Sequence, residues 1–450
     1  MSIQVLNVQD RLEDVLHQQD LVQASEILST LDAGTLARII DRLDPPEAAV
    51  AFRLIRQDQI GYVFEKLDPP VQSEIIEHLH DAEVTRLFVD LEAHERVALI
   101  DELPAELARE LWSQLDSDEV ESTATIMGYP TGSVARWMTT RMVVARVDDT
   151  VGEVLPKVDD GLADAEMVYV IPVVDSEDVV QGILSLRNLL QSRHDLSTPT
   201  SQIIRQATLL PATMSAEEAA QEFSRTGALA LPVVDHGQHL LGMVTIDDAV
   251  RILEDEIDED VARAGGAEPL RQPYLRTSVR QLFQSRIIWL FALAVSALFT
   301  VQVLDAFQDE LAKVIVLSLF IPLLVGIGGN TGNQAATTVT RAIALGDVHM
   351  RDIGKVALHE NAVGFCLGAT LGSVGFVVAS IIFGVDIGLV IGLTIVAICT
   401  LAATVGGIMP IIGKRLGIDP AVFSNPFIST FCDASGLLIY FLIAKLVLGI

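Results

Sequence analysis

The chain has 450 residues, of which half are hydrophobic and one fifth are charged, and its formal net charge is −30 at pH 7. This length allows several domains. The excess of negative charge lies entirely in residues 1–270, which carry 51 acidic and 19 basic side chains, against 9 acidic and 11 basic in the remainder. A surface this acidic repels nucleic acid and anionic lipid and attracts cations, so nucleic acid is excluded as a partner.

The N-terminus, MSIQVLNVQD, has neither the basic start nor the apolar stretch of a secretory signal peptide. We therefore expect the acidic part of the chain to stay in the cytosol. The three cysteines, Cys366, Cys399 and Cys432, lie singly inside apolar runs. Their spacing predicts neither a disulfide framework nor a cysteine metal site.

In residues 1–130 an apolar residue, usually leucine, recurs every twelve positions. Two segments of this series, LDPPEAAVAF and LDPPVQSEII, place an aspartate before a proline pair, which is typical of a helix start. A unit of one short helix and a turn, repeated in this way, predicts an α-solenoid. An ordinary amphipathic bundle is the alternative. The series is Leu31, Leu43, Ile55, Leu67, Leu79, Leu91, Leu103 and Leu115.

Residues 131–250 contain a second repeat, with a period of 60. IPVVDSEDVVQGILSLRNLL begins at Ile171 and LPVVDHGQHLLGMVTIDDAV at Leu231, and each predicts strand, turn, strand and helix start. The pair resembles tandem α/β CBS domains, which bind nucleotides or ions between their two copies. This resemblance makes ATP a candidate ligand, with Thr245 and Asp248 at the ribose-contacting positions and Arg187 as a further contact. Ser185 and Asn188 stand at the corresponding places of the first copy, and a pair that binds no nucleotide is the alternative.

Residues 251–285 connect this pair to the apolar half, and we expect them to form a helical linker. Six of the seven residues from Glu254 to Asp260 are acidic. On a helix, like charges spaced three and four residues apart repel one another. Divalent cations would relieve that repulsion, so the linker is a candidate cation sensor. A solvated helix face is the alternative.

Residues 286–450 contain five apolar segments, each near the 20 residues that a helix needs to cross a bilayer. Basic residues cluster before the first segment and in the connections after the second and fourth. This bias predicts a cytosolic N-terminus and an external C-terminus, in the plasma (inner) membrane. The predicted spans are Ile287–Leu304, Val314–Thr340, Asn361–Val385, Ile387–Gly413 and Ala421–Ala444.

The fifth span contains one charge, Asp433, near its middle. An ionised carboxylate there costs about 2.5–3.5 kcal/mol on insertion scales, so it should face water or an ion. Pairing with a basic group of another span is the alternative, but no Lys or Arg lies deep in any span. Asn425 lies eight residues earlier, about 12 Å away along the same helix face. Oxygen ligands without Cys or His suit a hard cation such as hydrated Mg²⁺.

The second span contains GIGGNTGNQAATT from Gly326. Its glycines permit close backbone approach, and close helix packing is sufficient to explain them. The amide side chains of Asn330, Asn333 and Gln334 beside them favour an ion path.

The motifs GGNTGNQAAT and GIDPAVFSNPF, with the order of the parts, resemble the MgtE family of magnesium channels over nearly the whole chain. The resemblance implies a homodimer in the lipid bilayer, with one pore lined by the second and fifth spans. The linker corresponds to the family's plug helix. The implied pore residues are Asn330, Asn333, Asp419, Asn425 and Asp433, and the implied regulatory metal ligands are Glu217, Asp248, Glu256, Glu259 and Asp260. Gly227 and Arg251 stand where family members have acids, and acids near His94 are also replaced.

These observations predict a multidomain membrane protein that conducts Mg²⁺ and is closed by cytosolic Mg²⁺, with other divalent cations as further candidate ions. A proton-coupled carrier that uses Asp433 is one alternative. A nucleotide-sensing CBS protein with a membrane anchor and no transport is another. The sequence contains no nucleophile, catalytic metal or phosphate-loop pattern, so we do not expect an enzyme.

Overall fold

The computed structural model describes residues 3–79, 81–270, 272, 274, 276–344, 346–416 and 425–449, and for 3–7, 81–83 and 425–426 the backbone alone. These residues form two compact units. We name the two units after the locations that the sequence predicts: the cytosolic unit comprises residues 1–256 and 271–277, and the membrane unit comprises 257–270 and 278–450.

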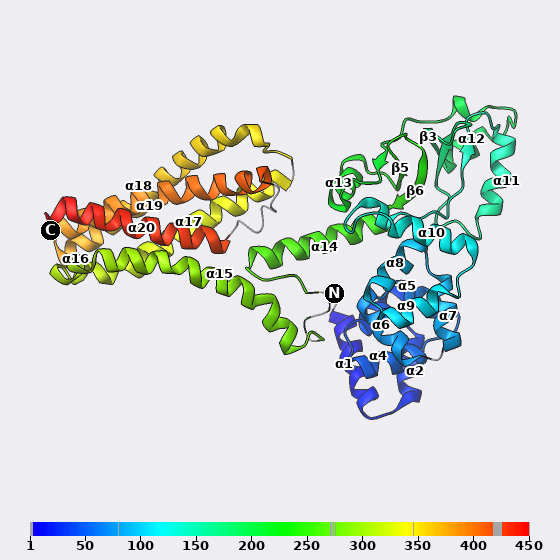
Figure 1. Ribbon diagram of the computed structural model, residues 1–450, viewed down its shortest axis with the longest axis horizontal. Helices are drawn as coiled ribbons and strands as arrows, with labels where there is room; N and C mark the ends of the chain where they lie inside the picture. The colour runs from blue at the N-terminus through cyan, green and yellow to red at the C-terminus, as the bar shows by residue number, and fades with distance from the viewer. Residues whose placement is uncertain are drawn as a thin grey trace. The chain divides into compact units, whose positions relative to one another are not determined.

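The first part of the cytosolic unit is a succession of short helices (Figure 1). The twelve-residue series predicted its core: Leu43, Ile55, Leu67, Leu91 and Leu103 are buried in one cluster, and the other three members pack against it. The helices are α1 (Ile3–His17), α2 (Leu21–Ser29), α3 (Ala33–Ile40), α4 (Pro45–Arg53), α5 (Ile60–Glu65), α6 (Pro69–His78), α7 (Asp81–Asp90), α8 (Ala93–Glu102), α9 (Ala105–Trp112) and α10 (Ser117–Met127).

The two proline pairs begin helices α4 and α6, as the sequence predicts. Asp44 and Asp68 occupy the N-cap positions, but neither carboxylate accepts a capping hydrogen bond. The prolines explain the difference, because a helix that opens with two prolines has fewer free N–H groups to cap.

The 60-residue repeat appears as two three-stranded sheets of identical topology, ordered β1-β2-β3 and β4-β5-β6. In each sheet the first two strands are parallel and the last two antiparallel, and a register shift falls after Val173 in one and Val233 in the other. The elements are β1 (Ala145–Arg146), α11 (Val151–Gly161), β2 (Val170–Val174), β3 (Val180–Ser185), α12 (Leu186–Ser192), β4 (Leu210–Pro211), α13 (Ala216–Thr226), β5 (Ala230–Val234) and β6 (Leu240–Thr245), with one-turn helices at Val134–Trp137 and Thr200–Gln202.

The acidic linker begins as a direct continuation of the second repeat. Helix α14 runs from Ile246 to Ala264 and therefore has residues in both compact units. The structure differs here from the single helix expected over 251–285, because Gly265 and Gly266 end α14. Gly266 has a φ of +70°, and the Ala267 N–H bonds back to the Ala262 carbonyl over 3.0 Å. Glycine adopts this left-handed conformation without strain, which makes it a common helix terminator.

Among the described residues, five helices are long and apolar enough to cross a membrane, which confirms the number of predicted spans. Helix α19 packs against α17, α18 and α20 (Figure 1). On α18, a Cβ added to Gly364 or Gly368 would lie only 2.6–2.7 Å from α19 backbone atoms, so small residues allow this contact. The helices are α15 (Val279–Ala306), α17 (Val316–Ala344), α18 (Ile353–Phe383), α19 (Val385–Arg415) and α20 (Asn425–Leu448), with the short α16 (Gln308–Lys313) and a one-turn helix at Met350–Asp352.

Candidate functional site

The contact between α17 and α20 is made by the glycines of the second-span motif. A Cβ added to Gly332 would lie 2.7 Å from Ile428 Cγ2 and 3.1 Å from Cys432 Sγ, and one added to Gly329 would lie 3.5 Å from Ser429 Oγ. These glycines therefore let the two backbones approach closely. Close packing, which the sequence left open as their role, is what the geometry supports for the glycines themselves.

One amide of the motif joins this contact directly. Asn333 Nδ2 donates a hydrogen bond of 3.0 Å to Ser429 Oγ on α20. Its other amide atom, Oδ1, is buried and has no hydrogen-bond partner in the described part of the chain. A buried carbonyl oxygen left without a partner costs about 1–3 kcal/mol. An oxygen held in this way is suited to accept from a water molecule or to approach a cation.

The other amides of α17 point outward. Asn330, Gln334 and Thr338 are all exposed and lie at intervals of four residues, so they form one polar row along the helix. The Thr338 hydroxyl donates to the Gln334 carbonyl over 2.8 Å, but hydrocarbon would offer no partner to the amides of Asn330 and Gln334. The row therefore requires water or a second polar surface beside it.

Helix α20 carries the candidate charge. Asp433 is half-buried, and it lies one helical turn after Ser429 and two turns after Asn425. All three residues therefore share one face of the helix. The sequence analysis did not select Ser429, although its position four residues from both Asn425 and Asp433 places it on the same helix face. The side chain of Asn425 and the whole of Asp419 lie outside the described residues.

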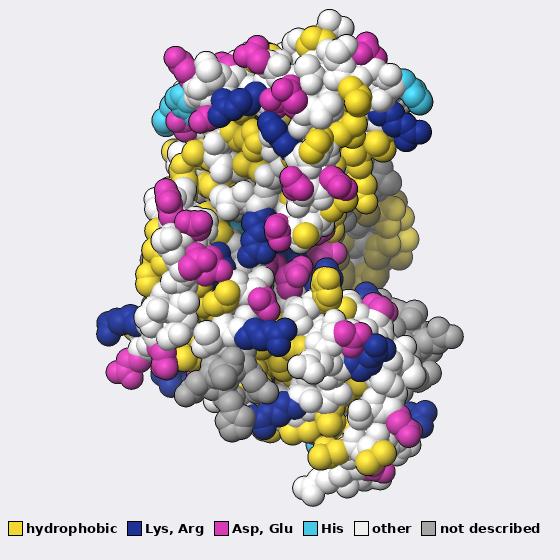
Figure 2. All heavy atoms as spheres, turned by 90° about the vertical axis from the view of Figure 1, so that its right-hand side faces the viewer, with side chains coloured by type: hydrophobic (Ala, Val, Ile, Leu, Met, Phe, Trp, Pro, Cys, Tyr) yellow, Lys and Arg dark blue, Asp and Glu magenta, His cyan; other side chains and the backbone are white. Residues whose placement is uncertain are grey.

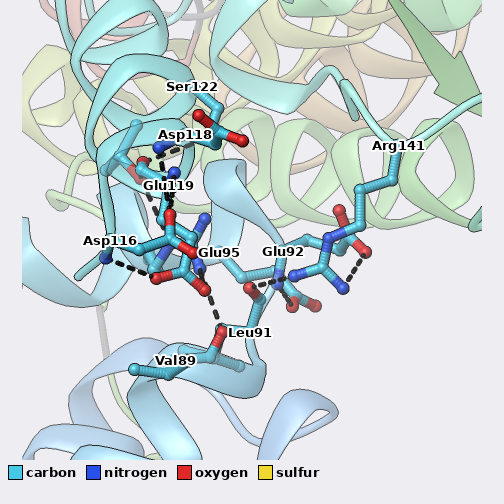
Figure 3. A network of polar contacts seen from close by, with 11 residues as sticks. Val89, Leu91, Glu92, Glu95, Asp116, Asp118, Glu119, Ser122 and Arg141 are labelled. Carbon is cyan, nitrogen blue, oxygen red and sulfur yellow. Dashed lines mark hydrogen bonds and ion pairs between the residues drawn. The ribbon is translucent and has the colours of Figure 1, made fainter. Parts of the chain in front are cut away.

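In the cytosolic unit, a polar network joins α8 to the segment before β1. Arg141 Nη1 lies 3.2 Å from Glu92 Oε1, and Arg141 Nη2 donates to the Leu91 carbonyl over 3.1 Å. Thr139 Oγ1 donates to the second Glu92 oxygen over 3.1 Å. Figure 3 shows Arg141 turned toward Glu92, with the carboxylates of Glu95 and Glu119 nearby. The ion pair and the hydrogen bonds described for this junction are all made between residues of the protein.

Asp248, a candidate for both metal and nucleotide, lies in this same region and is only 5 % exposed. Its Oδ2 is 3.8 Å from His94 Nε2, its Oδ1 is 3.9 Å from Arg251 Nη1, and Thr245 Oγ1 donates to it over 3.1 Å. Burial raises the pKa of Asp248 to about 6. The structure thus brings Thr245 and Asp248 together, but it encloses the carboxylate with side chains of the protein.

The first repeat has the equivalent arrangement without the charge. Ser185 Oγ accepts from the Asn188 backbone N–H over 3.2 Å and caps α12. Arg187, the third nucleotide candidate, is exposed on α12. The paired positions that the sequence matched, 185 with 245 and 188 with 248, are therefore structurally equivalent.

The linker acids share helix α14 but belong to different units. Glu256 lies in the cytosolic unit, whereas Glu259 and Asp260 lie in the membrane unit, where Arg263 pairs with Glu259. Glu217, on α13, is exposed and accepts from Gln221 Nε2 over 3.0 Å. Within the described ranges, no group of three or more His, Cys, Asp and Glu side chains is placed to hold a metal ion. Figure 2 shows acidic side chains spread over one face of the molecule and interspersed with basic ones.

Comparison with known proteins gives matches along most of the chain. Residues 321–443 match a family model described as a divalent cation transporter, residues 31–132 match the MgtE intracellular N domain, and residues 133–195 and 201–255 match the CBS domain. Together with the five apolar helices, these matches define a multi-pass membrane transporter of divalent cations.

Individual relatives identify the family and the transported ion of its members more narrowly. The magnesium transporter MgtE of Thermus thermophilus is 32 % identical over 95 % of this chain and 98 % of its own length. The MgtE of Enterococcus faecalis is 29 % identical over 73 % of this chain and 72 % of its own. The chain belongs to the MgtE family of magnesium transporters.

Solved structures cover the cytosolic part. The soluble part of a magnesium transporter matches with a TM-score of 0.47 and 22 % identity, over 56 % of this chain and 99 % of that one. The cytosolic domain of the Mg²⁺ channel MgtE in complex with ATP matches with a TM-score of 0.49 and 25 % identity, over 54 % and 99 %.

Proposed function

We propose that this chain is a Mg²⁺ channel for magnesium uptake and that cytosolic Mg²⁺ closes it. The observation that carries the proposal is the polar face of α20, where Asn425, Ser429 and Asp433 follow one another at single-turn spacing inside an apolar span. Asn333 joins this face through Ser429. A carboxylate that shares a helix face with amide and hydroxyl residues is suited to water and a hard cation.

The chemistry of these ligands favours hydrated Mg²⁺. Magnesium gives up its water reluctantly and is held through a few carboxylates and its own water molecules. One carboxylate with neighbouring amide oxygens matches that mode of binding. Other divalent cations of similar size are expected to compete for the same oxygens.

The assembly that we propose is a homodimer in the plasma membrane, with the cytosolic unit inside and the C-terminus outside. The exposed row of Asn330, Gln334 and Thr338 supports it, because a polar row on a membrane helix requires a polar partner. A second copy of the same row across a two-fold axis would enclose a polar path.

Closure by Mg²⁺ is proposed to depend on the acidic linker and the charge of residues 1–270. The proposed ligands are Glu256, Glu259 and Asp260, with Glu217 and Asp248 as further members. Ions that bind the closed state more tightly shift the equilibrium by RT ln(1 + [L]/Kd) for each site, which is about 0.4 kcal/mol when the concentration equals Kd. Several weak sites acting together are therefore needed for a sharp response.

Nucleotide binding at the CBS pair is a separate proposal. Thr245 and Asp248 are the residues that would contact a ribose, and both are buried, with His94 of α8 beside Asp248. His94 would have to withdraw from Asp248 before ATP could reach it.

The test is a recording from the purified full-length protein in a planar bilayer with Mg²⁺ as the main charge carrier. Unitary current steps that close when Mg²⁺ is added on the cytosolic side are the expected result. Asp433→Asn, which keeps the size of the side chain and removes its charge, should lower the conductance strongly without loss of expression. A flux without unitary steps would instead indicate a carrier.

A further inference from the structure

Two described side chains of helix α15 are buried, and they lie near the start of the helix, whereas Val303 and Leu304 near its end are partly buried against the core of the membrane unit. The buried residues are Ser285, which is 9 % exposed, and Trp289, which is 8 % exposed. They lie one helical turn apart and so share one face. Most of the remaining α15 side chains, including Phe291 and Leu298, are exposed.

Both buried residues are contacted by Glu268, which follows the end of α14. The Glu268 backbone N–H donates to the Ser285 carbonyl over 2.9 Å, and the indole N–H of Trp289 donates to Glu268 Oε1, also over 2.9 Å. A hydrogen bond to an ionised carboxylate is roughly twice as strong as one between neutral groups. The segment is thereby attached to α15 by its backbone and by its side chain.

The other side of Trp289 faces the helix that carries the candidate ion ligands. Its ring lies edge to face with Phe427 of α20, with ring centroids 6.3 Å apart and an angle of 61° between the planes. Phe427 precedes Asp433 by six residues, about 9 Å along the helix. Tryptophan at the end of a membrane span ordinarily faces the lipid headgroups, but this one is buried between two protein elements.

These contacts are continuous with the acidic linker. Helix α14 ends at Ala264, and the bond from the Ala267 N–H to the Ala262 carbonyl fixes the direction in which the chain leaves it. Glu268 comes one residue later. A change in the position of the end of α14 would therefore move Trp289. Through the ring contact with Phe427 it would also move the start of α20.

We propose that Trp289 is a positioning residue that couples the acidic linker to the pore helix, with Glu268 and Phe427 as its two partners. This inference rests on the proposed function, since it assigns a route for the closing signal. Without the contact, the position of α14 no longer biases α20, so more cytosolic Mg²⁺ is needed for closure. Permeation itself does not depend on it, because none of these three side chains is a proposed ion ligand.

The experiment measures two quantities in the full-length channel: the cytosolic Mg²⁺ concentration that gives half-closure, and the unitary conductance. Trp289→Phe keeps an aromatic ring against Phe427 and removes the N–H donor. Glu268→Ala removes the acceptor, and Glu268→Gln keeps an acceptor oxygen. Ser285→Ala is the matched control, because Ser285 accepts through its backbone carbonyl, and among the described residues its hydroxyl bonds only to Leu282 of the same helix.

We expect Trp289→Phe and Glu268→Ala each to raise the half-closing concentration about fivefold or more, at unchanged conductance. Glu268→Gln and Ser285→Ala should stay within about twofold of the parent. The double variant Glu268→Ala/Trp289→Phe should shift no further than the larger single change, because both remove one contact. Since Glu268 is exposed, its variants report even if Trp289→Phe does not fold.

Half-closing concentrations equal to that of the parent in both single variants would overturn the proposal, as would additive shifts in the double variant. A parent channel that shows no closure by Mg²⁺ would instead overturn the proposed function. The two failures are therefore distinguishable in the same recordings.

Discussion

Asn333 of α17 donates its side-chain hydrogen bond to Ser429 of α20, although the two residues are 96 positions apart in the sequence. The bond fixes the direction of the Asn333 carbonyl oxygen, which is buried and unpaired among the described residues. Ser429 therefore orients the Asn333 carbonyl oxygen of the neighbouring helix, and it places its own hydroxyl oxygen beside it.

Ser429→Ala should reduce Mg²⁺ conductance about two- to tenfold while the protein remains folded. The loss of one hydrogen bond is worth about 0.5–1.5 kcal/mol, and the freed amide can then rotate. Single-channel recording measures the effect. Ser296→Ala is the control, because in the described part of the chain the Ser296 hydroxyl bonds only to the Ala292 carbonyl within α15. Equal conductance in both variants would show that the orientation of Asn333 does not matter.

Mg²⁺ in the millimolar range should protect the isolated residues 1–270 from protease. These residues carry a net charge of −32, and a divalent cation can bridge two carboxylates whereas monovalent salt only screens them. Digestion in MgCl₂ and in NaCl of equal ionic strength separates the two effects. If the two salts protect equally, the acidic surface responds to ionic strength alone.

Replacing Glu256, Glu259 and Asp260 together by Ala changes two opposing effects. The loss of like charges eases compaction without metal, whereas the loss of ligands removes the Mg²⁺-specific attraction. Ligation should dominate in millimolar Mg²⁺, because a bound dication attracts carboxylates whereas neutralisation only stops their repulsion. Currents should therefore persist at cytosolic Mg²⁺ that silences the parent. Patch recording with stepped Mg²⁺ decides this, and closure at the parental concentration would falsify the assignment of these acids.

Glu95→Gln should stabilise residues 1–270 at pH 8 but not near pH 4.5. Burial and the neighbouring Glu65 raise the pKa of Glu95 to about 8. The folded state therefore retains a proton that the unfolded state releases above its own lower pKa. Stability is greatest below the unfolded pKa and falls as the pH rises toward 8. A pKa difference of one corresponds to about 1.4 kcal/mol, so we expect a gain of at least ~1 kcal/mol at pH 8.

Urea unfolding at the two pH values measures this gain. Glutamine keeps the oxygen that accepts from the Glu92 N–H over 3.0 Å, so the cap of α8 is preserved. Glu26→Gln, at an exposed position of α2, is the control for the substitution itself. A destabilised Glu95→Gln variant at pH 8 would mean that the carboxylate is favourable in its ionised form.

The sequence predicts those features that recur at a fixed spacing. The twelve-residue leucines are buried because each repeat presents the same position to one continuous core. The 60-residue repeat is equally readable, since Val173 and Val233 carry the same register shift in the two sheets. The five apolar spans follow from composition, because length and hydropathy alone decide which helices can cross a bilayer.

Contacts between distant elements leave no such pattern. Asn333 bonds to Ser429, and Asp248 lies beside His94 in addition to its sequence neighbours Thr245 and Arg251. Nothing near Asn333 or Asp248 in the sequence indicates Ser429 or His94. The extent of α14 was also misjudged, because its start continues the second repeat while its end depends on Gly265 and Gly266. The sequence also leaves open whether Asp248 binds an ion, since its neighbours are His94 of α8 as well as Arg251 of α14.

Helix α14 spans the boundary between the two units without a break, and its 19 residues make a rod about 28 Å long. A hydrogen-bonded helix resists stretching and twisting, so a rotation of α14 at Ile246 turns Ala264 by the same angle. Inserting one alanine after Glu256 would turn the later part of α14, with Glu259 and Asp260, by about 100° relative to Glu256. The chain would then leave α14 at Gly265 in a different direction, and a closing signal carried by the helix would arrive with the wrong orientation.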